Sequence, residues 1–434
     1  MDIYKDEILT SRSTNLFADY ESNESLQKLT DEFIIQDLID QFNTSETEIL
    51  PQLLNLRDAI NSNRILNCSL FEENQNLELL KHILLTSINI SYKEIISDIL
   101  FVCFKKISPE KLNLFNDIEF FKYLYDNCDQ RHDYAFKLLG IIVTLSQDAR
   151  DFLFSDCSIE TLLQSYSMKQ DSLDNLLWLI SCASYLDTER YPILLNFALE
   201  CISSNQEISM MQMRYLTYIL YCVCNNGHAS DVFSHSLFTF DLISKIFSIN
   251  DINSSRQMLR AMNLMIYQTQ GTFQLPTDFI SSLLHHSNPN ILNEIFEFIR
   301  YSTVLNADSA QVMVNEGIMD TFSDIFQNGS TSQKNIALPA MESIVANIGR
   351  PNYLQVLPHL MQFLDTDDEE HCSIALRLFY RFFNACDDDE ILKDSKQHFQ
   401  EEGGMDLLNE LLENDNLYDL VDSIIDLFND ENQV

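Results

Sequence analysis

The side chains that could do chemistry in this sequence are its cysteines, its histidines and two acidic runs. The runs, residues 365 to 370 and 387 to 390, superficially suggest calcium ligands, but they lack the glycine and the glutamate that a calcium loop needs. The cysteines form no C-x-x-C pair, and only His285 and His286 are adjacent histidines. Motifs for phosphate binding, nucleophilic catalysis and metalloprotease chemistry are also missing. We therefore expect no catalytic residue, no metal, no cofactor and no enzymatic activity, and we expect the cysteines to be reduced core residues.

Acidic side chains dominate the charge of the chain. The sequence has 27 Lys and Arg against 66 Asp and Glu, which gives a net charge of −39. Such a charge repels nucleic acid and anionic membranes and attracts basic proteins or peptides, although it could equally serve solubility alone. Residues 365 to 434 contain 21 Asp and Glu and only 4 Lys and Arg. The C-terminal end therefore carries a disproportionate share of the negative field.

The length and composition favour a continuous helical array. With 434 residues, of which 46% are apolar, the chain can bury a large interior, yet it is longer than one globular core usually becomes. Only 8 Pro and 8 Gly are present, so the linkers expected between separate domains are not evident. No apolar run approaches the roughly 18 residues of a membrane span, and the N-terminus lacks the apolar core of a secretory signal. We expect a soluble intracellular protein.

Apolar blocks with helical spacing recur along the chain and would position any functional side chain. Equivalent positions in successive blocks are about 40 residues apart, which is the period of armadillo and HEAT repeats rather than of ankyrin or tetratricopeptide repeats. A second set of apolar stretches alternates with these blocks, as the preceding helix of each pair would. The equivalent positions are Cys103, Ile141, Cys182, Cys222, Leu264, Arg300, Glu342 and Arg381.

This pattern predicts an all-α fold, a right-handed α-solenoid of about nine to ten armadillo repeats. Residues 1 to 32 are polar and lack the periodicity, so we expect a flexible N-terminal arm. Residues 33 to 434 form the predicted solenoid, which begins with a capping repeat over residues 33 to 67 and ends with an acidic capping repeat. Pro339 falls inside one of the apolar blocks, where it should kink the helix or shift its start.

Four stretches of the sequence resemble the armadillo domain of importin-α, the adaptor that carries basic nuclear-localisation peptides. Their order and spacing follow that family, and the resemblance extends from residue 33 to residue 434. Unrelated armadillo proteins share the period but not the double-glycine closing motif of the last stretch. The four stretches are LLGIIVTLSQDARDFLF, the triplet Leu259-Arg260-Ala261, QVMVNEGIM and EEGGMDLLNELLENDNLYDLVDSIIDLF.

The resemblance implies a peptide groove built on a W-x-x-x-N pattern, in which Asn clamps the peptide backbone and Trp forms slots for Lys and Arg stems. None of the equivalent positions given above, which are the Asn sites, is Asn here. Among the Trp sites only Trp178 keeps the indole, and it could instead be an ordinary core residue. We expect cargo in a concave acidic groove around Trp178, Tyr218, Arg260, Phe296, Arg300 and Glu342.

The closing motif implies a second partner surface. In the importin-α family the final repeats meet the export receptor that returns the adaptor to the cytoplasm, so the resemblance implies the same role for this end of the chain. The same charges could instead belong to a capping repeat that keeps the end of a solenoid soluble. The candidate residues are Glu401, Glu402, Asp406, Glu410 and Glu413.

Two functions follow from these patterns. The first is an importin-α-like adaptor for nuclear protein import, which binds basic nuclear-localisation peptides and an export receptor and occurs in the cytoplasm and the nucleus. Nothing before residue 33 is basic enough to be the family's importin-β-binding segment, so we expect neither importin-β binding nor the usual autoinhibition. The alternative is a non-transport armadillo scaffold for a protein complex or the cytoskeleton, which the loss of the Asn positions favours. Both hypotheses exclude binding to nucleic acid and to membranes.

Overall fold

The computed structural model describes most of the chain from residue 74 onward, and within these ranges every regular element is a helix. The fold is therefore all-α, as the periodicity predicts. The predicted N-terminal arm and nearly all of the first capping repeat lie outside the described residues. The described ranges are 74–106, 113–128, 133–154, 173–185, 190–204, 207–286, 288–348, 356–366, 368–386 and 388–429, with single positions between 50 and 58 and at 161.

The chain divides into two compact units, and the division falls between Ile193 and Leu194, inside helix α12 (Tyr191–Ser203). The sequence predicts a single array over residues 33 to 434 and does not indicate this division. We call the parts the N-terminal unit and the C-terminal unit.

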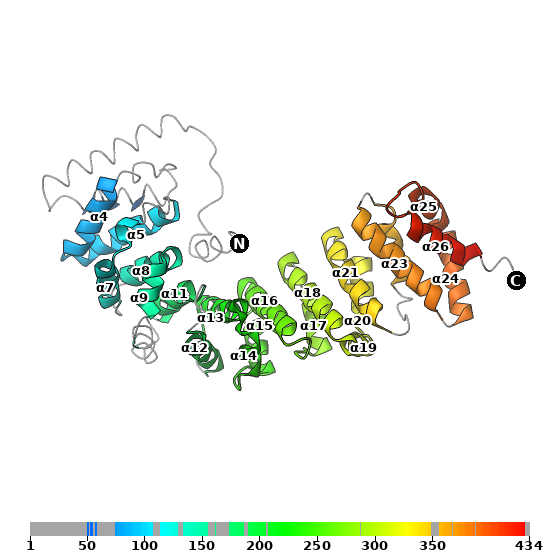
Figure 1. Cartoon of the computed structure of the whole chain (residues 1–434), viewed down its shortest axis with the longest axis horizontal. Helices are drawn as coiled ribbons and strands as arrows, with labels where there is room; N and C mark the ends of the chain where they lie inside the picture. The colour runs from blue at the N-terminus through cyan, green and yellow to red at the C-terminus, as the bar shows by residue number, and fades with distance from the viewer. Residues whose placement is uncertain are drawn as a thin grey trace, which may run out of the picture. The chain divides into compact units, whose positions relative to one another are not determined.

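The N-terminal unit stacks three long helices side by side, since α8 contacts both α5 and α11 (Figure 1). Shorter helices cover them, with α4 on α5, and α7 and α9 on α8. The helices are α4 (Asn74–Thr86), α5 (Ile90–Lys106), α7 (Ile118–Asp126), α8 (Asp133–Leu145), α9 (Gln147–Phe154) and α11 (Leu173–Ser184), with a 3₁₀ turn at Asn113–Phe115.

The C-terminal unit repeats the same arrangement over more helices. One row consists of α13, α16, α18, α21, α23 and α26, each in contact with the next, and we call it the long-helix row (Figure 1). The row is formed by α13 (Met210–Val223), α16 (Ile252–Gln268), α18 (Pro289–Leu305), α21 (Thr331–Asn347), α23 (Glu369–Ala385) and α26 (Tyr418–Asn429).

Shorter helices accompany the long-helix row. Helices α15, α17, α20 and α25 contact α16, α18, α21 and α26 respectively, and α20 also contacts α17 and α22. The short helices form a second layer, so apolar residues are enclosed between two layers of helices. They are α14 (Ala229–Ser234), α15 (Phe240–Ser248), α17 (Thr277–Leu284), α19 (Ala307–Asn315), α20 (Ile318–Asn328), α22 (Leu357–Leu360), α24 (Asp389–Glu401) and α25 (Gly404–Leu411), with a π-helical segment at Cys224–His228 and a 3₁₀ turn at Met361–Phe363.

Polar side chains fix where the long helices begin. Asp251 caps α16 by accepting from the backbone N–H of Ser254, and Ser330 forms a reciprocal capping box with Gln333 at the start of α21. Asn288 caps α18, and Pro289 takes the first helical position, where no N–H is needed. The starts of these helices are therefore encoded locally.

Two glycines shape equivalent junctions between short helices. Gly317 joins α19 to α20 and Gly403 joins α24 to α25, and both have left-handed φ angles, of 89° and 84°. A side chain would strain the backbone in this conformation. The next glycine, Gly404, lies against the ring of Phe399, because an added Cβ would stand 2.4 Å from that ring. These constraints give a physical reason for the double glycine of the closing motif.

Pro339 lies in the middle of α21, which begins eight residues earlier at Thr331 and continues to Asn347. Of the two predicted effects, a kink or a shifted start, the shifted start is not observed. Proline has no N–H to bond the carbonyl of the residue four positions earlier, Asn335. That carbonyl instead accepts from Nε2 of His371 on α23, at 3.0 Å. A side chain of the neighbouring long helix thus replaces the missing backbone bond.

Candidate partner-binding site

The single tryptophan is buried in the N-terminal unit. Trp178 on α11 is 1% exposed, and its ring meets the ring of Phe101 on α5 edge-on, with centroids 6.2 Å apart. It also lies against Gly140 on α8, where an added Cβ would stand 2.6 Å from the indole Nε1. The glycine of the LLGIIVTL stretch therefore makes room for the indole, and the ring presents no open face to a peptide.

The other two aromatic candidates, in the C-terminal unit, are buried as well. Tyr218 on α13 is 3% exposed and Phe296 on α18 is 1% exposed. Phe296 contacts Phe322 of α20, with ring centroids 6.0 Å apart, so it joins the long-helix row to the second layer. The prediction that Trp178, Tyr218 and Phe296 line a groove is thus corrected by their burial.

The physical reason is that helical spacing does not reveal which face meets solvent. Residues four positions apart share one face of a helix. Cys182 and Cys222, four positions after Trp178 and Tyr218, are also buried, so this face of α11 and of α13 belongs to the core. Burial raises the pKa of the Cys222 thiol to about 12, so this cysteine is a neutral apolar residue near neutral pH.

The charged candidates lie nearer to solvent, but two of them are held in ion pairs between helices. Arg260 of α16 donates from Nε to the carboxylate of Glu294 on α18, and Nε of Arg256 lies 3.5 Å from the same oxygen. The Glu294 side chain is only 13% exposed. This carboxylate is therefore occupied by two arginines and is a poor anchor for a basic ligand.

Glu342 on α21 pairs with Arg377 on α23. Nε and one terminal nitrogen of Arg377 donate to the two carboxylate oxygens, at 2.5 and 3.2 Å. Arg300 of α18 is 47% exposed and pairs with Glu297 of its own helix at 2.6 Å. The structure thus gives Arg260 and Glu342 contacts that join neighbouring long helices and leaves Arg300 at the surface.

These pairs belong to a pattern that the sequence motifs do not single out. Polar bridges join neighbouring long helices, and in each the partners are 34 to 40 residues apart, which is about one repeat. The signal that could have revealed Glu294 and Asp251 is an opposite charge recurring one period away from a base. The bridges are Asp98–Lys137, Arg214–Asp251, Thr217–Gln257, Arg260–Glu294, Thr303–Ser343 and Glu342–Arg377.

Among the ion pairs of this set, the one with the most buried carboxylate joins α13 to the start of α16. Asp251 is 3% exposed on its side chain, and it accepts from Nε and a terminal nitrogen of Arg214 at 2.6 to 3.0 Å. Burial alone would raise the pKa of Asp251, but hydrogen bonds from Arg214 and Ser254 outweigh it and hold that pKa below its usual value. Asp251 is therefore a carboxylate at neutral pH.

The predicted C-terminal partner surface is exposed. The carboxylates lie on α24, at its end, and on or just after α25, and each of them is open to solvent. No Lys or Arg pairs with them among the described residues. These carboxylates are open to solvent, and their role in binding a partner stays a prediction. The residues are Glu401, Glu402, Asp406, Glu410 and Glu413.

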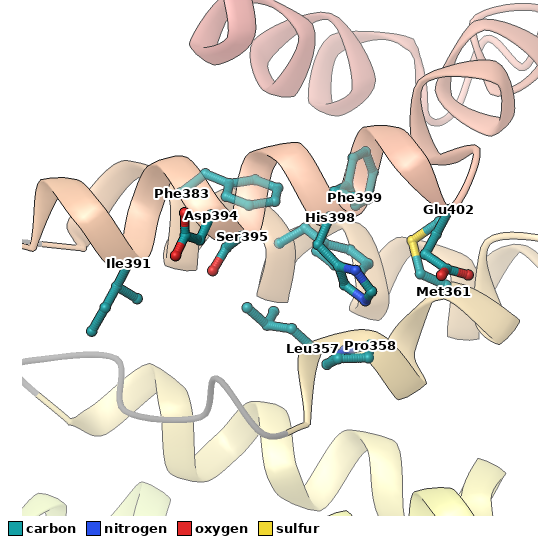
Figure 2. Close-up of a pocket in the computed structure, with 11 residues that line it drawn as sticks. Leu357, Pro358, Met361, Phe383, Ile391, Asp394, Ser395, His398, Phe399 and Glu402 are labelled. Carbon is teal, nitrogen blue, oxygen red and sulfur yellow. The ribbon is translucent and has the colours of Figure 1, made fainter.

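A cavity of about 240 Å³ opens beside this surface (Figure 2). It lies between α22 with the turn that follows it, α23 and α24. The sequence does not predict it, because its walls come from residues that are not neighbours in the chain. The lining residues are Leu357, Pro358, Met361, Phe379, Phe383, Ile391, Asp394, Ser395, His398, Phe399 and Glu402.

The described residues contain no group of three or more metal-ligating side chains that could hold an ion. In the same residues, no helix combines the length and the apolar character needed to cross a membrane.

Comparisons with known proteins bear on the fold alone. No protein-family model matches the chain, and no curated protein matches its sequence. Among solved structures, the chain is similar to a crystal structure described as that of an engineered protein. The TM-score is 0.65 at 13% sequence identity, and the match covers 91% of this chain and 98% of the other. The likeness is consistent with the all-helical fold of the described residues and does not identify a family or an activity.

Proposed function

We propose that this chain is a right-handed armadillo-type solenoid of about nine to ten repeats. In its support, each long helix of the C-terminal unit contacts the next, shorter helices form a second layer, and polar bridges recur one repeat apart. The glycine junctions at Gly317 and Gly403 recur in the same place within their repeats. A solenoid of this kind offers an extended surface for binding other proteins rather than an enclosed catalytic site.

The function we propose is that of an importin-α-like adaptor for nuclear protein import, which acts in the cytoplasm and the nucleus without catalysis or a cofactor. The observation that carries it is the geometry of the closing motif. Gly403 and Gly404 are both required by the turn into α25, and the five carboxylates of the C-terminal partner surface are exposed. An export receptor is the partner that we propose for this surface.

Cargo recognition in this proposal is electrostatic. The buried rings of Trp178, Tyr218 and Phe296 offer no slots for Lys or Arg stems, so the ring-and-amide clamp of the importin-α family is not part of the mechanism. A basic nuclear-localisation peptide would instead be attracted by the net charge of −39 and by exposed carboxylates such as that of Glu297, whose side chain is 40% exposed. Charge attraction of this kind is screened by salt.

Titration of the full chain with a labelled basic localisation peptide tests the cargo part of the proposal. We expect measurable binding at about 50 mM salt and clearly weaker binding at about 300 mM. Glu297→Gln should weaken it, whereas Glu410→Gln, the matched change at the C-terminal surface, should not. Absence of binding at the lower salt concentration would rule out the hypothesis that the protein carries basic localisation peptides.

The alternative function is a non-transport scaffold for a protein complex or the cytoskeleton. The buried rings and the ion pairs of Arg260 and Arg377 favour it, because they use the would-be groove residues to hold helices together. Affinity purification from cells separates the two functions. If the protein is an adaptor, an export receptor should co-purify with it, and Glu401→Gln together with Glu402→Gln should reduce the amount of bound receptor. If it is a scaffold, neither that receptor nor importin-β should co-purify.

A further inference from the structure

The cavity beside α24 has an apolar interior. Leu357, Met361, Phe383 and Phe399 line it (Figure 2), and Phe379 is a further apolar lining residue. The two phenylalanines of α23 and Phe399 belong to one aromatic cluster, in which the ring of Phe399 lies 4.9 Å from that of Phe379 and 5.6 Å from that of Phe383. The walls are therefore held by packing on both sides and form a defined recess.

The rim of the cavity is polar and mostly acidic. Asp394, His398 and Glu402 are exposed residues of α24 and its end, and Ile391 stands among them with 38% of its surface exposed. Ile391 also lines the recess, so it extends the apolar lining of the recess to the protein surface. Glu402 also belongs to the C-terminal partner surface, so the two features adjoin.

One polar atom inside the cavity has no partner. The hydroxyl of Ser395 lines the recess and is buried, yet it makes no hydrogen bond within the described part of the chain. Figure 2 shows this hydroxyl directed from α24 toward the space above Leu357. A buried polar group without a partner is unfavourable, so a ligand that offers a donor or acceptor at this place would relieve that cost.

We infer that this cavity binds one bulky apolar side chain from a basic segment of a partner protein, with Lys or Arg next to that side chain on Asp394 and Glu402. A backbone amide of the segment then pairs with the Ser395 hydroxyl. This site is separate from the residues that the sequence predicts to bind cargo, and the inference is compatible with either proposed function.

The volume of the cavity and the charge around it favour an apolar side chain from a basic segment over other ligands. Sites for drug-sized molecules enclose roughly 300 to 1,000 Å³, so a recess of about 240 Å³ fits one side chain better than a whole small molecule. Residues 365 to 434 contain 21 acidic and 4 basic residues. One of the four, Lys396, is buried and donates to the carbonyl of Leu427, so it does not neutralise the rim. A second copy of this acidic chain would be repelled.

Selection from a library of short random peptides tests the inference, with the full chain as bait. We expect the selected peptides to carry a Leu, Ile, Met or Phe beside Lys or Arg. Ile391→Glu, at the open edge of the recess, should lower the affinity for the selected peptides about tenfold or more. The matched control, Ile252→Glu, changes an isoleucine that is 42% exposed at the start of α16 and should leave binding unchanged.

Ser395→Ala separates ligand binding from folding. Removal of an unpartnered hydroxyl should leave the thermal stability of the free protein unchanged or higher, while the affinity for a selected peptide falls a few-fold because its hydrogen bond is lost. Asp394→Asn with Glu402→Gln should lower affinity and flatten its dependence on salt.

Three results would overturn the inference. They are a library that yields no peptide, selected peptides without basic residues, and equal binding to the Ile391→Glu and Ile252→Glu proteins. Ile391 and Ser395 are on α24, whereas Glu297, on which the titration with the localisation peptide reports, is on α18. The failure of one proposal is therefore distinguishable from the failure of the other.

Discussion

Gly140 and Trp178 are in contact, and the absence of a side chain at Gly140 makes room for the indole of Trp178. The indole can be buried only because α8 has no side chain at the point of contact, where a Cβ would lie 2.6 Å from Nε1. At the scale of residues, this contact decides that the one tryptophan belongs to the core of the N-terminal unit rather than to a surface.

Gly140→Ala should therefore destabilise the N-terminal unit by about 1–3 kcal/mol, because overpacking displaces the indole. Denaturant unfolding followed by tryptophan fluorescence measures this, since Trp178 is the only tryptophan in the sequence. The double variant Gly140→Ala with Trp178→Phe should lose less than the sum of the two single changes; the variants without tryptophan are followed by far-UV circular dichroism instead. Strict additivity would mean that the two residues do not touch. A basic peptide bound elsewhere should leave the fluorescence of Trp178 unchanged.

The ion pair between Asp251 and Arg214 leads to a second prediction at the scale of residues. Asp251→Asn should keep a helix cap, because Asn caps as well as Asp, but it removes the charge that pairs with Arg214. We expect a loss of about 3 kcal/mol at pH 7, measured by urea unfolding. Asp388→Asn, the same change at an exposed cap of α24, should cost far less.

The pH dependence of that loss has a definite sign. The folded pKa of Asp251 is lowered, so its contribution is complete above the unfolded pKa of about 3.9 and disappears as the pH falls through the folded value. The difference in unfolding free energy between the wild type and Asp251→Asn should therefore shrink below about pH 4. A difference that stays constant down to pH 3 would contradict the ion pair.

At the scale of elements, the continuity of α21 depends on its neighbour α23. Pro339 leaves the Asn335 carbonyl without a backbone donor, and His371 provides one. Loss of this donor leaves a backbone acceptor unsatisfied between two packed helices. The proline is thus tolerated because of a residue of the next repeat.

His371→Ala should cost about 1–3 kcal/mol, the penalty for an unsatisfied buried group. Pro339→Ala supplies an N–H for the same carbonyl, so in that background the loss of His371 should cost much less. A double-mutant cycle measured by thermal or urea unfolding gives the coupling. A coupling near zero would show that the histidine contributes something other than this hydrogen bond.

For the whole molecule, the excess of negative charge should be visible in its salt response. With a net charge of −39, self-repulsion opposes the compact state. Raising NaCl from about 20 mM to about 300 mM should raise the melting temperature, because salt screens repulsion between exposed charges more than it screens half-buried pairs such as Arg214–Asp251. A melting temperature that falls with salt would mean that the ion pairs between helices outweigh the repulsion.

Much of the helical order could be predicted from the sequence. Apolar spacing at three and four residues depends only on local geometry, and each of the eight equivalent positions, such as Ile141 and Arg381, lies in a long helix. The glycine turn into α25 and the caps at Asp251 and Ser330 are also local signals. The exposure of the C-terminal acids followed from their charge alone.

Which face of each helix meets solvent was decided only by tertiary packing. Spacing by four residues places Trp178 and Cys182 together, yet only the arrival of Gly140 and Phe101 from other helices makes that face interior. Arg260 pairs with Glu294 of another helix, 34 residues later in the sequence. The cavity forms only when α22, α23 and α24 pack together. The sequence by itself determined the helices and their period, because these depend on neighbours in the chain. The partners of Trp178, Arg260, Glu342 and Pro339 come from other helices far along the chain, so only the folded structure could assign them.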